Sequence, residues 1–265
     1  MSFYGTSFIF DGIPSDMYGL VLANFDGSKQ AASNYGGKLT IQENRISGRA
    51  TGLHYGTIAN EALSFPITLV ACQDNRRLDR YEQAAVAGWL TGHSEYKTLV
   101  ICQPDMEGIY YKCLITELNA CEIGMRQVGF TATVTCDGPY AYRNMVNEKI
   151  SCSGTKNYLY RNMSNVNDLY KPVITIDCSG TQFSIENKTN GILFELSEME
   201  DKDRIITVDC MNQVMESSDG ENLYQYWNGG IIKEFPSFTR GDNQIVLSGN
   251  GNVTIRNEFP WNVGY

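Results

Sequence analysis

Apolar and polar residues alternate along most of this chain, and few stretches follow a helical spacing. The segment 130–136 is representative, because its four apolar residues are separated by threonines. A period of two indicates strands with one buried face. In the first half of the chain the pattern predicts strands at 7–10, 20–23, 38–43, 64–72, 97–102, 109–118 and 127–136.

One segment departs from this alternation and predicts an amphipathic helix over about residues 75–92. Asp74 or Asn75 can cap its start, and Gly92 stands where a helix end favours a left-handed residue. Gly88 costs about 1 kcal/mol relative to alanine, which suggests a close approach to another backbone there. The apolar positions are spaced by three and four: Leu78, Tyr81, Ala85, Trp89 and Leu90.

The strongest break in the pattern is Asp137-Gly138-Pro139, since proline cannot continue a central strand. It predicts a boundary between a domain at 1–140 and a second at 141–265. Short runs separated by turn residues favour a β-sandwich for the second domain. Its expected strands are 149–153, 158–161, 173–178, 182–186, 192–196, 204–209, 213–216, 244–247 and 252–257.

Composition excludes several classes of protein. The 265 residues agree with two domains, and 42% hydrophobic with 19% charged residues is typical of globular proteins. The net charge of −9 argues against a protein that grips nucleic acid by its phosphates. No apolar window is long enough to span a bilayer, and the N-terminus lacks a signal-peptide pattern. We therefore expect a soluble protein made in the cytoplasm.

Eight cysteines are the oddest feature of the composition, yet no two form a C-x-x-C pair and no histidine lies beside one. A zinc site is therefore disfavoured. Without an export signal, disulfides are disfavoured as well. We expect these thiols to be buried in strands, where a free cysteine acts as a small hydrophobe. They are Cys72, Cys102, Cys113, Cys121, Cys136, Cys152, Cys178 and Cys210.

The chain offers little catalytic chemistry. Its two histidines, His54 and His93, have no nucleophile motif to serve, and no phosphate-binding glycine loop is present. An acidic cluster could cleave a glycoside or bind Ca²⁺, but its position between two expected strands favours a solvated turn. We therefore expect no enzyme, no cofactor and no metal. The cluster consists of Glu195, Glu198, Glu200, Asp201 and Asp203.

Tyr224, Tyr226 and Trp227 form an aromatic cluster before Asn228-Gly229-Gly230. Three interpretations stay open. The segment can be a loop packed on the sandwich edge, a protein interface, or a platform on which sugar rings stack.

Several motifs, taken in order, resemble the distal tail proteins (Dit) of long-tailed, siphovirus-type bacteriophages. The opening matches in the segments 8–12 and 18–20, a helix follows that ends in a Trp-Leu pair, and the first half closes at 136–141. The C-terminal segments 241–245 and 253–261 resemble the closing strands of the family. The residues that carry the signature, all structural, are Phe10, Asp11, Gly12, Tyr18, Gly19, Trp89, Gly138 and Pro139.

This resemblance implies a mainly β protein, with a β-barrel-like or split-sandwich N-terminal domain carrying one helix, followed by a galectin-like β-sandwich. It implies a structural virion protein of the tail tip, of which six copies form a ring. The ring joins the tail tube protein to the tail-tip hub, and DNA and the tape measure protein pass through its lumen. A receptor-binding protein is a further partner, and no membrane is involved.

The acidic composition agrees with such a conduit, because six copies would carry six times the net charge of −9 and would not hold DNA. Three other classes compete. A carbohydrate-binding module for host-surface recognition is the first alternative, with Tyr224, Tyr226 and Trp227 as its surface. A tail-tube subunit and an enzyme follow, the latter weakened by the missing catalytic constellation.

Overall fold

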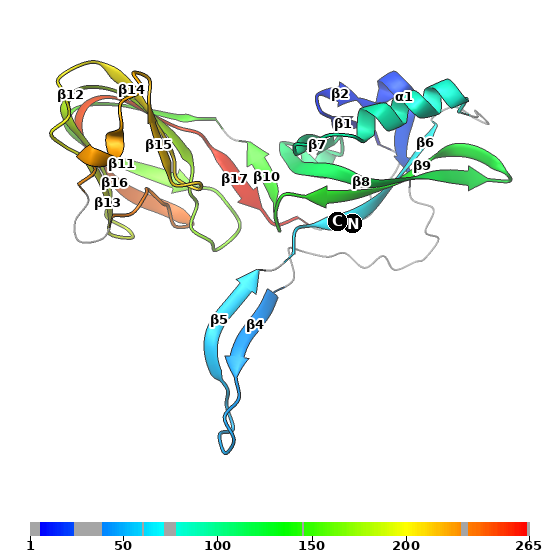
Figure 1. Cartoon of the computed structure of the whole chain (residues 1–265), viewed down its shortest axis with the longest axis horizontal. Helices are drawn as coiled ribbons and strands as arrows, with labels where there is room; N and C mark the ends of the chain where they lie inside the picture. Colours follow the sequence, from blue (N-terminus) through cyan, green and yellow to red (C-terminus); the bar gives the residue numbers. More distant parts are fainter. Residues whose placement is uncertain are drawn as a thin grey trace. The chain divides into compact units, whose positions relative to one another are not determined.

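The computed structural model describes residues 6–23, 39–59, 61–71, 78–144, 146–228 and 233–263, with the side chains of 39 and 57–59 left aside. The chain divides into two compact units (Figure 1). The N-terminal unit contains Met1–Tyr142 together with Trp261–Tyr265, and the C-terminal unit contains Arg143–Pro260. The break at Asp137-Gly138-Pro139 predicts that the chain passes from the first unit to the second near residue 140. Nothing in the sequence predicts that the chain returns to the first unit at Trp261.

The N-terminal unit is built on an antiparallel sheet. Its strands follow the order β2-β1-β7-β8-β9-β6-β3, and β10 pairs with both β8 and β17. The strands are β1 (Phe8–Phe10), β2 (Ile13–Pro14), β3 (Leu20–Ala23), β6 (Ser64–Ala71), β7 (Lys97–Ile101), β8 (Ile109–Ile123), β9 (Arg126–Cys136), β10 (Ala141–Asn144) and β17 (Glu258–Trp261). Residues 143–144 of β10 and 258–260 of β17 belong to the C-terminal unit.

This sheet is barrel-like without being a closed barrel, since its main path ends at β2 on one side and β3 on the other. One bridge joins β3 to the segment before β1, where the Leu22 amide donates to the Thr6 carbonyl at 2.8 Å. Two short 3-10 helices, η1 (Ser15–Tyr18) and η2 (Pro104–Met106), connect neighbouring strands.

Helix α1 (Arg80–Leu90) begins later than the expected 75–92. Its cap is Asp79, not Asp74 or Asn75, which lie outside the described residues. The Asp79 carboxylate accepts from the Glu82 amide at 2.8 Å, and the Glu82 carboxylate accepts from the Asp79 amide at 3.0 Å. This capping box satisfies two backbone donors at once, which explains where the helix begins.

Two glycines of this unit differ from their expected roles. A Cβ built on Gly88 would meet no described atom within 4 Å, so no close approach exists there. A Cβ on Gly129, in β9, would overlap the carbonyl oxygen of Leu69 in the neighbouring strand β6. Gly92, by contrast, has φ +83° and adopts the expected left-handed conformation.

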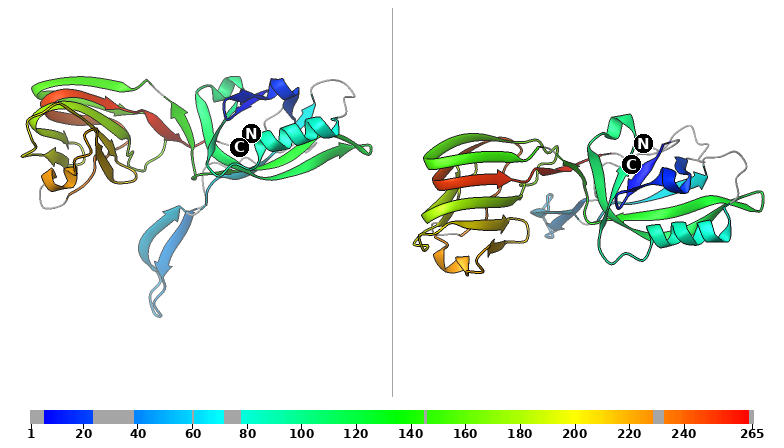
Figure 2. Two further views of the ribbon diagram at one scale, coloured as in Figure 1. Left: turned by 45° about the horizontal axis from the view of Figure 1, so that its top comes forward. Right: turned by 90° about the horizontal axis from the view of Figure 1, so that it is seen from above.

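The helix contributes Val86, Trp89 and Leu90 to the core of the N-terminal unit and lies along one side of the sheet (Figure 2). The strands contribute alternate residues, as their period of two predicts. Thus β6 buries Phe65, Ile67 and Leu69. No described helix is both long and apolar enough to cross a membrane.

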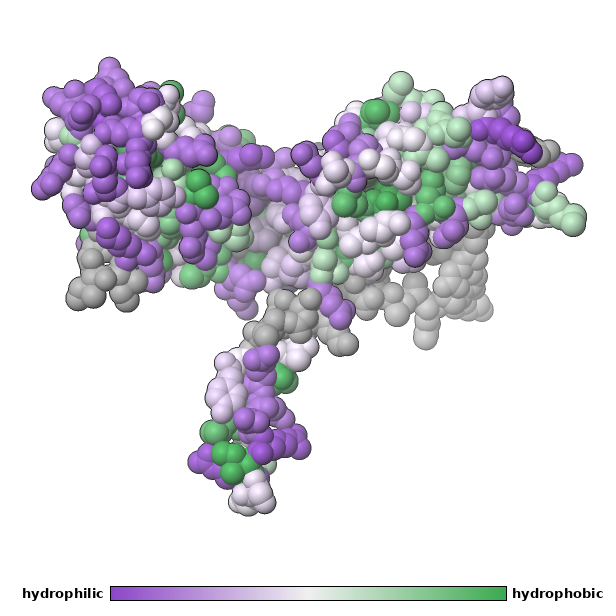
Figure 3. Space-filling model, viewed as in Figure 1, coloured by the Kyte–Doolittle hydropathy of each residue, from purple (hydrophilic) through white to green (hydrophobic). Residues whose placement is uncertain are grey.

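Strands β4 (Leu39–Asn44) and β5 (Leu53–Ala59) form a separate two-stranded hairpin. Within the described part of the chain, neither strand pairs with any other strand. Every residue from 40 to 55 is exposed except Gly52, which is half-buried. The hairpin nevertheless carries large apolar side chains among its polar ones (Figure 3), namely Ile41, Ile46, Leu53 and Tyr55.

The C-terminal unit is a second antiparallel sheet of order β11-β16-β12-β14-β15, with β13 added to β12. Three pairs of expected strands are in fact three continuous strands of 15 residues each. The strands are β11 (Glu148–Asn162), β12 (Val173–Asn187), β13 (Ile192–Leu196), β14 (Arg204–Asp209), β15 (Val214–Ser217) and β16 (Gly241–Ile255), with the short helix η3 at Leu223–Tyr226.

Strand β12 changes one of its partners midway, whereas β11 and β16 pair with each other along their whole length. The first part of β12 pairs with β14, whereas its last part pairs with β13. The pairing with β16 shifts between Ser179 and Phe183, so residues 180–182 form a bulge. The core contains inward-facing residues from both parts of β12, such as Ile176 and Ile185. The expected sandwich is therefore correct, with three strands shared by its two layers.

Candidate functional site

The signature residues near the N-terminus form a tight hairpin turn. Phe10 pairs with Ile13, and the two residues between them, Asp11 and Gly12, have φ of +52° and +76°. Two consecutive residues with positive φ form a type I′ turn, whose twist matches that of the two strands it joins, and an Asp-Gly pair favours this turn. The Asp11 amide also donates to the carbonyl of Thr98 at 2.9 Å.

Trp89 is the centre of an aromatic cluster in the N-terminal unit. Its ring stacks on Tyr18 at 4.6 Å and on Phe8 at 5.6 Å, and Phe10 meets it edge-on at 6.2 Å. The indole nitrogen donates to the Phe10 carbonyl at 3.2 Å, which satisfies the one polar group of this buried ring. Gly19, with φ +62°, ends η1 directly after Tyr18.

The remaining signature residues, Gly138 and Pro139, lie just after β9. The Gly138 carbonyl accepts from the Leu63 amide at 2.9 Å, and this bond ties the end of the unit to the start of β6. Next to it, the Tyr142 hydroxyl donates to the Asp137 carboxylate at 2.8 Å. The contacts described for these signature residues are those of turns, backbone pairing and core packing, and Asp11 also forms an ion pair with Lys97 at 3.4 Å.

The two histidines occupy different environments. His93 lies 2.8 Å from the Trp89 carbonyl through Nε2 and packs edge-on against Phe10. His54 is exposed on β5. Among the described residues, no group of three or more His, Cys, Asp or Glu side chains could hold a metal ion.

Five of the seven described cysteines are buried, namely Cys113, Cys136, Cys152, Cys178 and Cys210. Cys121 is half-buried and Cys102 is exposed, contrary to the expectation for all eight, and Cys72 lies outside the described residues. All seven are free thiols. Burial, aided by the charge of Asp137, raises the pKa of Cys113 to about 12, which keeps this thiol protonated and inert.

The acidic cluster between β13 and β14 is partly neutralised by a lysine. The Lys202 ammonium lies 3.1 Å from Glu200, 2.9 Å from Asp219 and 3.2 Å from Glu221. Glu221 also pairs at 2.8 Å with Arg204, whose side chain is fully buried. The hydrogen bonds that Lys202 donates to these three carboxylates raise the pKa of Lys202, so the ammonium stays charged. Asp201 and Asp203 remain exposed.

The aromatic cluster after β15 is largely tied to the interior. Trp227 is only 9% exposed and packs against Phe194 and Phe235 at 5.9 and 4.7 Å. The Tyr226 hydroxyl donates to Glu221 at 2.6 Å. Tyr224 is 42% exposed, and its hydroxyl accepts from the Met215 amide at 3.0 Å. Tyr224 therefore offers the largest exposed ring of the three.

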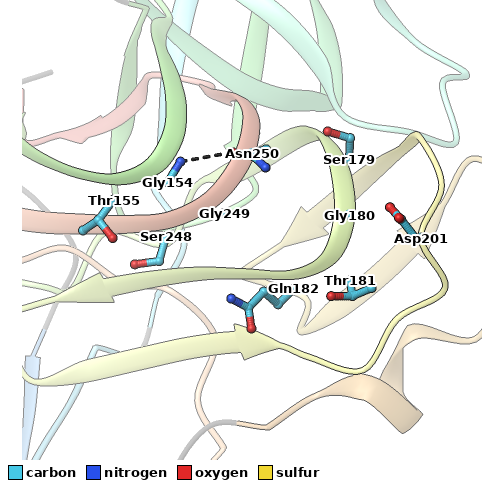
Figure 4. A pocket seen from close by; sticks show the side chains of 10 residues that line it. All are labelled: Gly154, Thr155, Ser179, Gly180, Thr181, Gln182, Asp201, Ser248, Gly249 and Asn250. Carbon is cyan, nitrogen blue, oxygen red and sulfur yellow. Dashed lines mark hydrogen bonds between the residues drawn. The ribbon is translucent and has the colours of Figure 1, made fainter.

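A polar hollow of about 470 Å³, not anticipated from the sequence, lies in the C-terminal unit (Figure 4). Its lining comes from the middle of the three long strands, with residues 154–155 of β11, 179–182 of β12 and 248–250 of β16, and from Asp201. The bulge of β12 therefore forms part of its wall. Two of its lining residues, Gly180 and Gly249, stand between expected strands in the sequence, where glycine favours a turn.

Comparison with known proteins identifies the family. A family model described as "Phage tail protein N-terminal domain" matches residues 3–138, and one described as "Phage tail C-terminal domain" matches residues 140–257. The chain belongs to this phage tail protein family. No curated protein matches the sequence of this tail protein.

Solved structures show that the tail protein shares its fold with a known phage component. The crystal structure titled "SPP1 Dit (gp 19.1) Protein, a Paradigm of Hub Adsorption Apparatus in Gram-positive Infecting Phages" matches with a TM-score of 0.69 and 11% identity. The match covers 96% of this chain and 98% of the other. The "Phage P2 Baseplate in its Activated Conformation with Ca" gives a TM-score of 0.45, 10% identity and coverage of 95% and 97%. The expected resemblance to the Dit family is confirmed at the level of the fold by the SPP1 Dit structure, and the described residues form a mainly β fold with one α-helix.

Proposed function

We propose that this tail protein is a distal tail component of the virion. In this proposal six copies form a ring that joins the tail tube protein to the tail-tip hub, and DNA and the tape measure protein pass through the lumen. The observation that carries the proposal is the likeness of fold to the SPP1 Dit protein, which extends over 96% of the chain and includes both units.

The β4–β5 hairpin supports assembly with other chains. A two-stranded hairpin alone is at best marginally stable in water, and no other described strand pairs with this one. Its Ile41 and Tyr55 side chains are 62% and 66% exposed. Covering them with a neighbouring copy would bury apolar surface and also protect the hairpin edges from unwanted pairing.

The charge supports the role of a conduit. A ring of six chains, each with a net charge of −9, would repel the phosphates of passing DNA. The proposed role is structural, which agrees with the match to phage tail protein families and with the likeness of fold to the SPP1 Dit protein. A receptor-binding protein is the expected further partner at the tail tip.

The test is the oligomeric state of the purified protein. Light scattering over a range of concentrations, together with negative-stain images in the presence of the tail tube and hub proteins, should reveal six-fold rings. The variant Ile41→Ser/Tyr55→Ser should weaken the ring without unfolding the chain. The matched control is Met211→Ser, which alters a 65% exposed side chain of the C-terminal unit. Monomers alone under every condition would contradict the proposal.

A further inference from the structure

Two cysteines of the N-terminal unit lie directly opposite each other on neighbouring strands. In the antiparallel pairing of β8 with β9, Cys113 stands across from Cys136. Residues that face each other in such a pair point to the same side of the sheet. Both side chains belong to the core of the unit, with exposed fractions of 0% and 1%. The two thiols are therefore neighbours in the interior.

The backbone hydrogen bonds identify the kind of strand pair that these cysteines form. The Cys136 amide donates to the Leu63 carbonyl at 2.8 Å, on the side of β9 away from Cys113. The next amide, of Asp137, donates to the Lys112 carbonyl at 2.9 Å. This pattern defines a non-hydrogen-bonded pair, whose Cα atoms lie about 4.5 Å apart. That separation falls within the range of about 4.4–6.8 Å that a disulfide spans.

Among the described residues, no other two cysteines face each other across a pair of strands. Cys121, also on β8, faces Gly129. Cys152 and Cys178 face the same residue, Gly251, from opposite sides of β16. Two strand spacings of about 4.8 Å each separate these two cysteines, which exceeds the limit of about 7 Å for a disulfide. The opposed arrangement therefore belongs to Cys113 and Cys136.

Burial controls when the opposed thiols can react. A cysteine reacts as its thiolate, and burial raises the pKa of Cys113 to about 12. Burial also raises the pKa of Cys136, with a contribution from the neighbouring Cys113. While the strands are paired, an outside reagent therefore meets no reactive sulfur. Local opening at the end of β9 exposes both thiols, so the frequency of opening sets the rate of reaction.

We propose that Cys113 and Cys136 are a dithiol that closes to a cross-strand disulfide in an oxidising medium. The oxidant is a small disulfide such as oxidised glutathione. The thiolate of one cysteine attacks a sulfur of this reagent, whose S–S bond breaks and releases one thiol. The thiolate of the second cysteine then attacks the mixed disulfide, and the other half of the reagent leaves as a second thiol. The protein loses two protons and two electrons, and the reagent gains them.

The disulfide fastens the β8–β9 hairpin at the end opposite its turn. The hydrogen bond between the Leu63 amide and the Gly138 carbonyl lies just beyond this end. A cross-link restricts the unfolded chain and so stabilises the folded unit. A component of the virion, as proposed above, leaves the reducing interior of the cell for an oxidising medium at release. The bond would thus form after assembly, although the chemistry of the two cysteines does not depend on that role.

The experiment uses the full chain, purified in its reduced form. The protein is incubated with oxidised glutathione at mildly alkaline pH, without urea and at urea concentrations below the unfolding transition. Remaining thiols are alkylated in denaturant, and tryptic peptides are analysed by mass spectrometry without reduction. Trypsin cuts after Lys112, Arg126 and Arg143, so the disulfide joins the peptide 113–126 to the peptide 127–143.

The joined peptides should accumulate with time, and faster as urea is added, because opening of the strands limits the reaction. Once the bond has formed, amide hydrogen exchange in β8 and β9 next to it should slow by about tenfold. Cys102, which is exposed, should carry glutathione in the same samples and so shows that the oxidant is active.

Three variants assign the bond to its cysteines. Cys113→Ala and Cys136→Ala should each abolish the joined peptides. Cys121→Ala is the matched control, because it removes the other cysteine of the peptide 113–126 and should leave the joined peptides in place. Fragment ions of the wild-type peptides distinguish Cys113 from Cys121, so the assignment holds even where a core variant does not fold.

Three outcomes would overturn the inference. The first is recovery of Cys113 and Cys136 as alkylated thiols at every urea concentration, while Cys102 carries glutathione. The second is glutathione on either core cysteine with no joined peptides, since the second sulfur would then be out of reach. The third is a bond between Cys121 and Cys136, because residues that far apart along the hairpin meet only after it unfolds.

Discussion

At the scale of single residues, the role of a glycine or an acidic residue depends on its neighbours in the folded chain, even where the sequence contexts are similar. Asp79 and Glu82 have the spacing that reciprocal capping requires, although the cap was expected at Asp74 or Asn75. The role of Gly129 was not readable, because it depends on the approach of β6, more than fifty residues away along the chain. Local spacing thus predicts local contacts, and pairing between distant strands decides the rest.

Gly88 and Gly129 make a matched pair of predictions. Gly88→Ala should raise the free energy of unfolding by about 0.5–1 kcal/mol, because the helix position is open and alanine has the higher propensity. Gly129→Ala should lower it by about 1–3 kcal/mol, because the methyl group forces β6 and β9 apart. Urea titration with hydrogen-exchange readout on β6 and β9 measures both. Equal effects of the two substitutions would refute the assignment.

At the scale of elements, most strand positions could be predicted from alternation, but their continuity could not. Turn signals at Gly180 and Gly249, and a gap between expected strands around Gly154, predict breaks in the chain, whereas all three glycines lie inside continuous strands, β12, β16 and β11. A glycine with positive φ permits either outcome, and only pairing with the neighbouring strand distinguishes them. The polar hollow arises at these bends, which is why reading the sequence did not find it.

Lys202, which precedes β14, forms ion pairs with Asp219 and Glu221, which follow β15. The connection between these two loops should depend on pH. The hydroxyl of Tyr226 lowers the pKa of Glu221, with help from Lys202 and Arg204. A carboxyl whose pKa is lowered by folding stabilises the folded state fully at pH values above its pKa in the unfolded chain, which is about 4.3 for glutamate. This stabilisation is lost as the pH falls through the pKa of the carboxyl in the folded state. The loops should therefore be equally stable at pH 7 and 5 and loosen below about pH 4.

Comparing Glu221→Gln with the wild type tests this directly. The variant leaves the buried guanidinium of Arg204 without its charged partner, so its melting temperature should be lower at pH 7. The difference between the two proteins should shrink as the pH falls through the lowered pKa of Glu221, because the wild-type carboxyl then becomes protonated as well. Glu216→Gln, at an exposed position of β15, should show no such pH-dependent difference. A constant difference across the whole range would exclude the linkage.

At the scale of the whole molecule, the sequence predicts two units but treats them as consecutive. In the structure the C-terminal unit is an insertion, because the chain returns to the N-terminal unit at Trp261. Trp261 and Val263 pack against the core that contains Trp89, although the whole C-terminal unit, residues 143–260, separates them from the rest of that unit in the chain. Neither residue belongs to an alternating run long enough to indicate which core it joins.

This arrangement predicts that two residues at the end of the chain stabilise only the N-terminal unit. Trp261→Ala/Val263→Ala should lower the free energy of unfolding of that unit by about 2–4 kcal/mol, because half-buried apolar surface is lost from its core. The C-terminal unit should keep its stability, since it has a separate core. Hydrogen exchange resolved by peptide distinguishes the units, and Ile205→Ala/Met211→Ala, at two exposed positions, is the control that should change neither. Destabilisation of both units by the same amount would mean that they unfold as one, and the insertion would then have no separate stability.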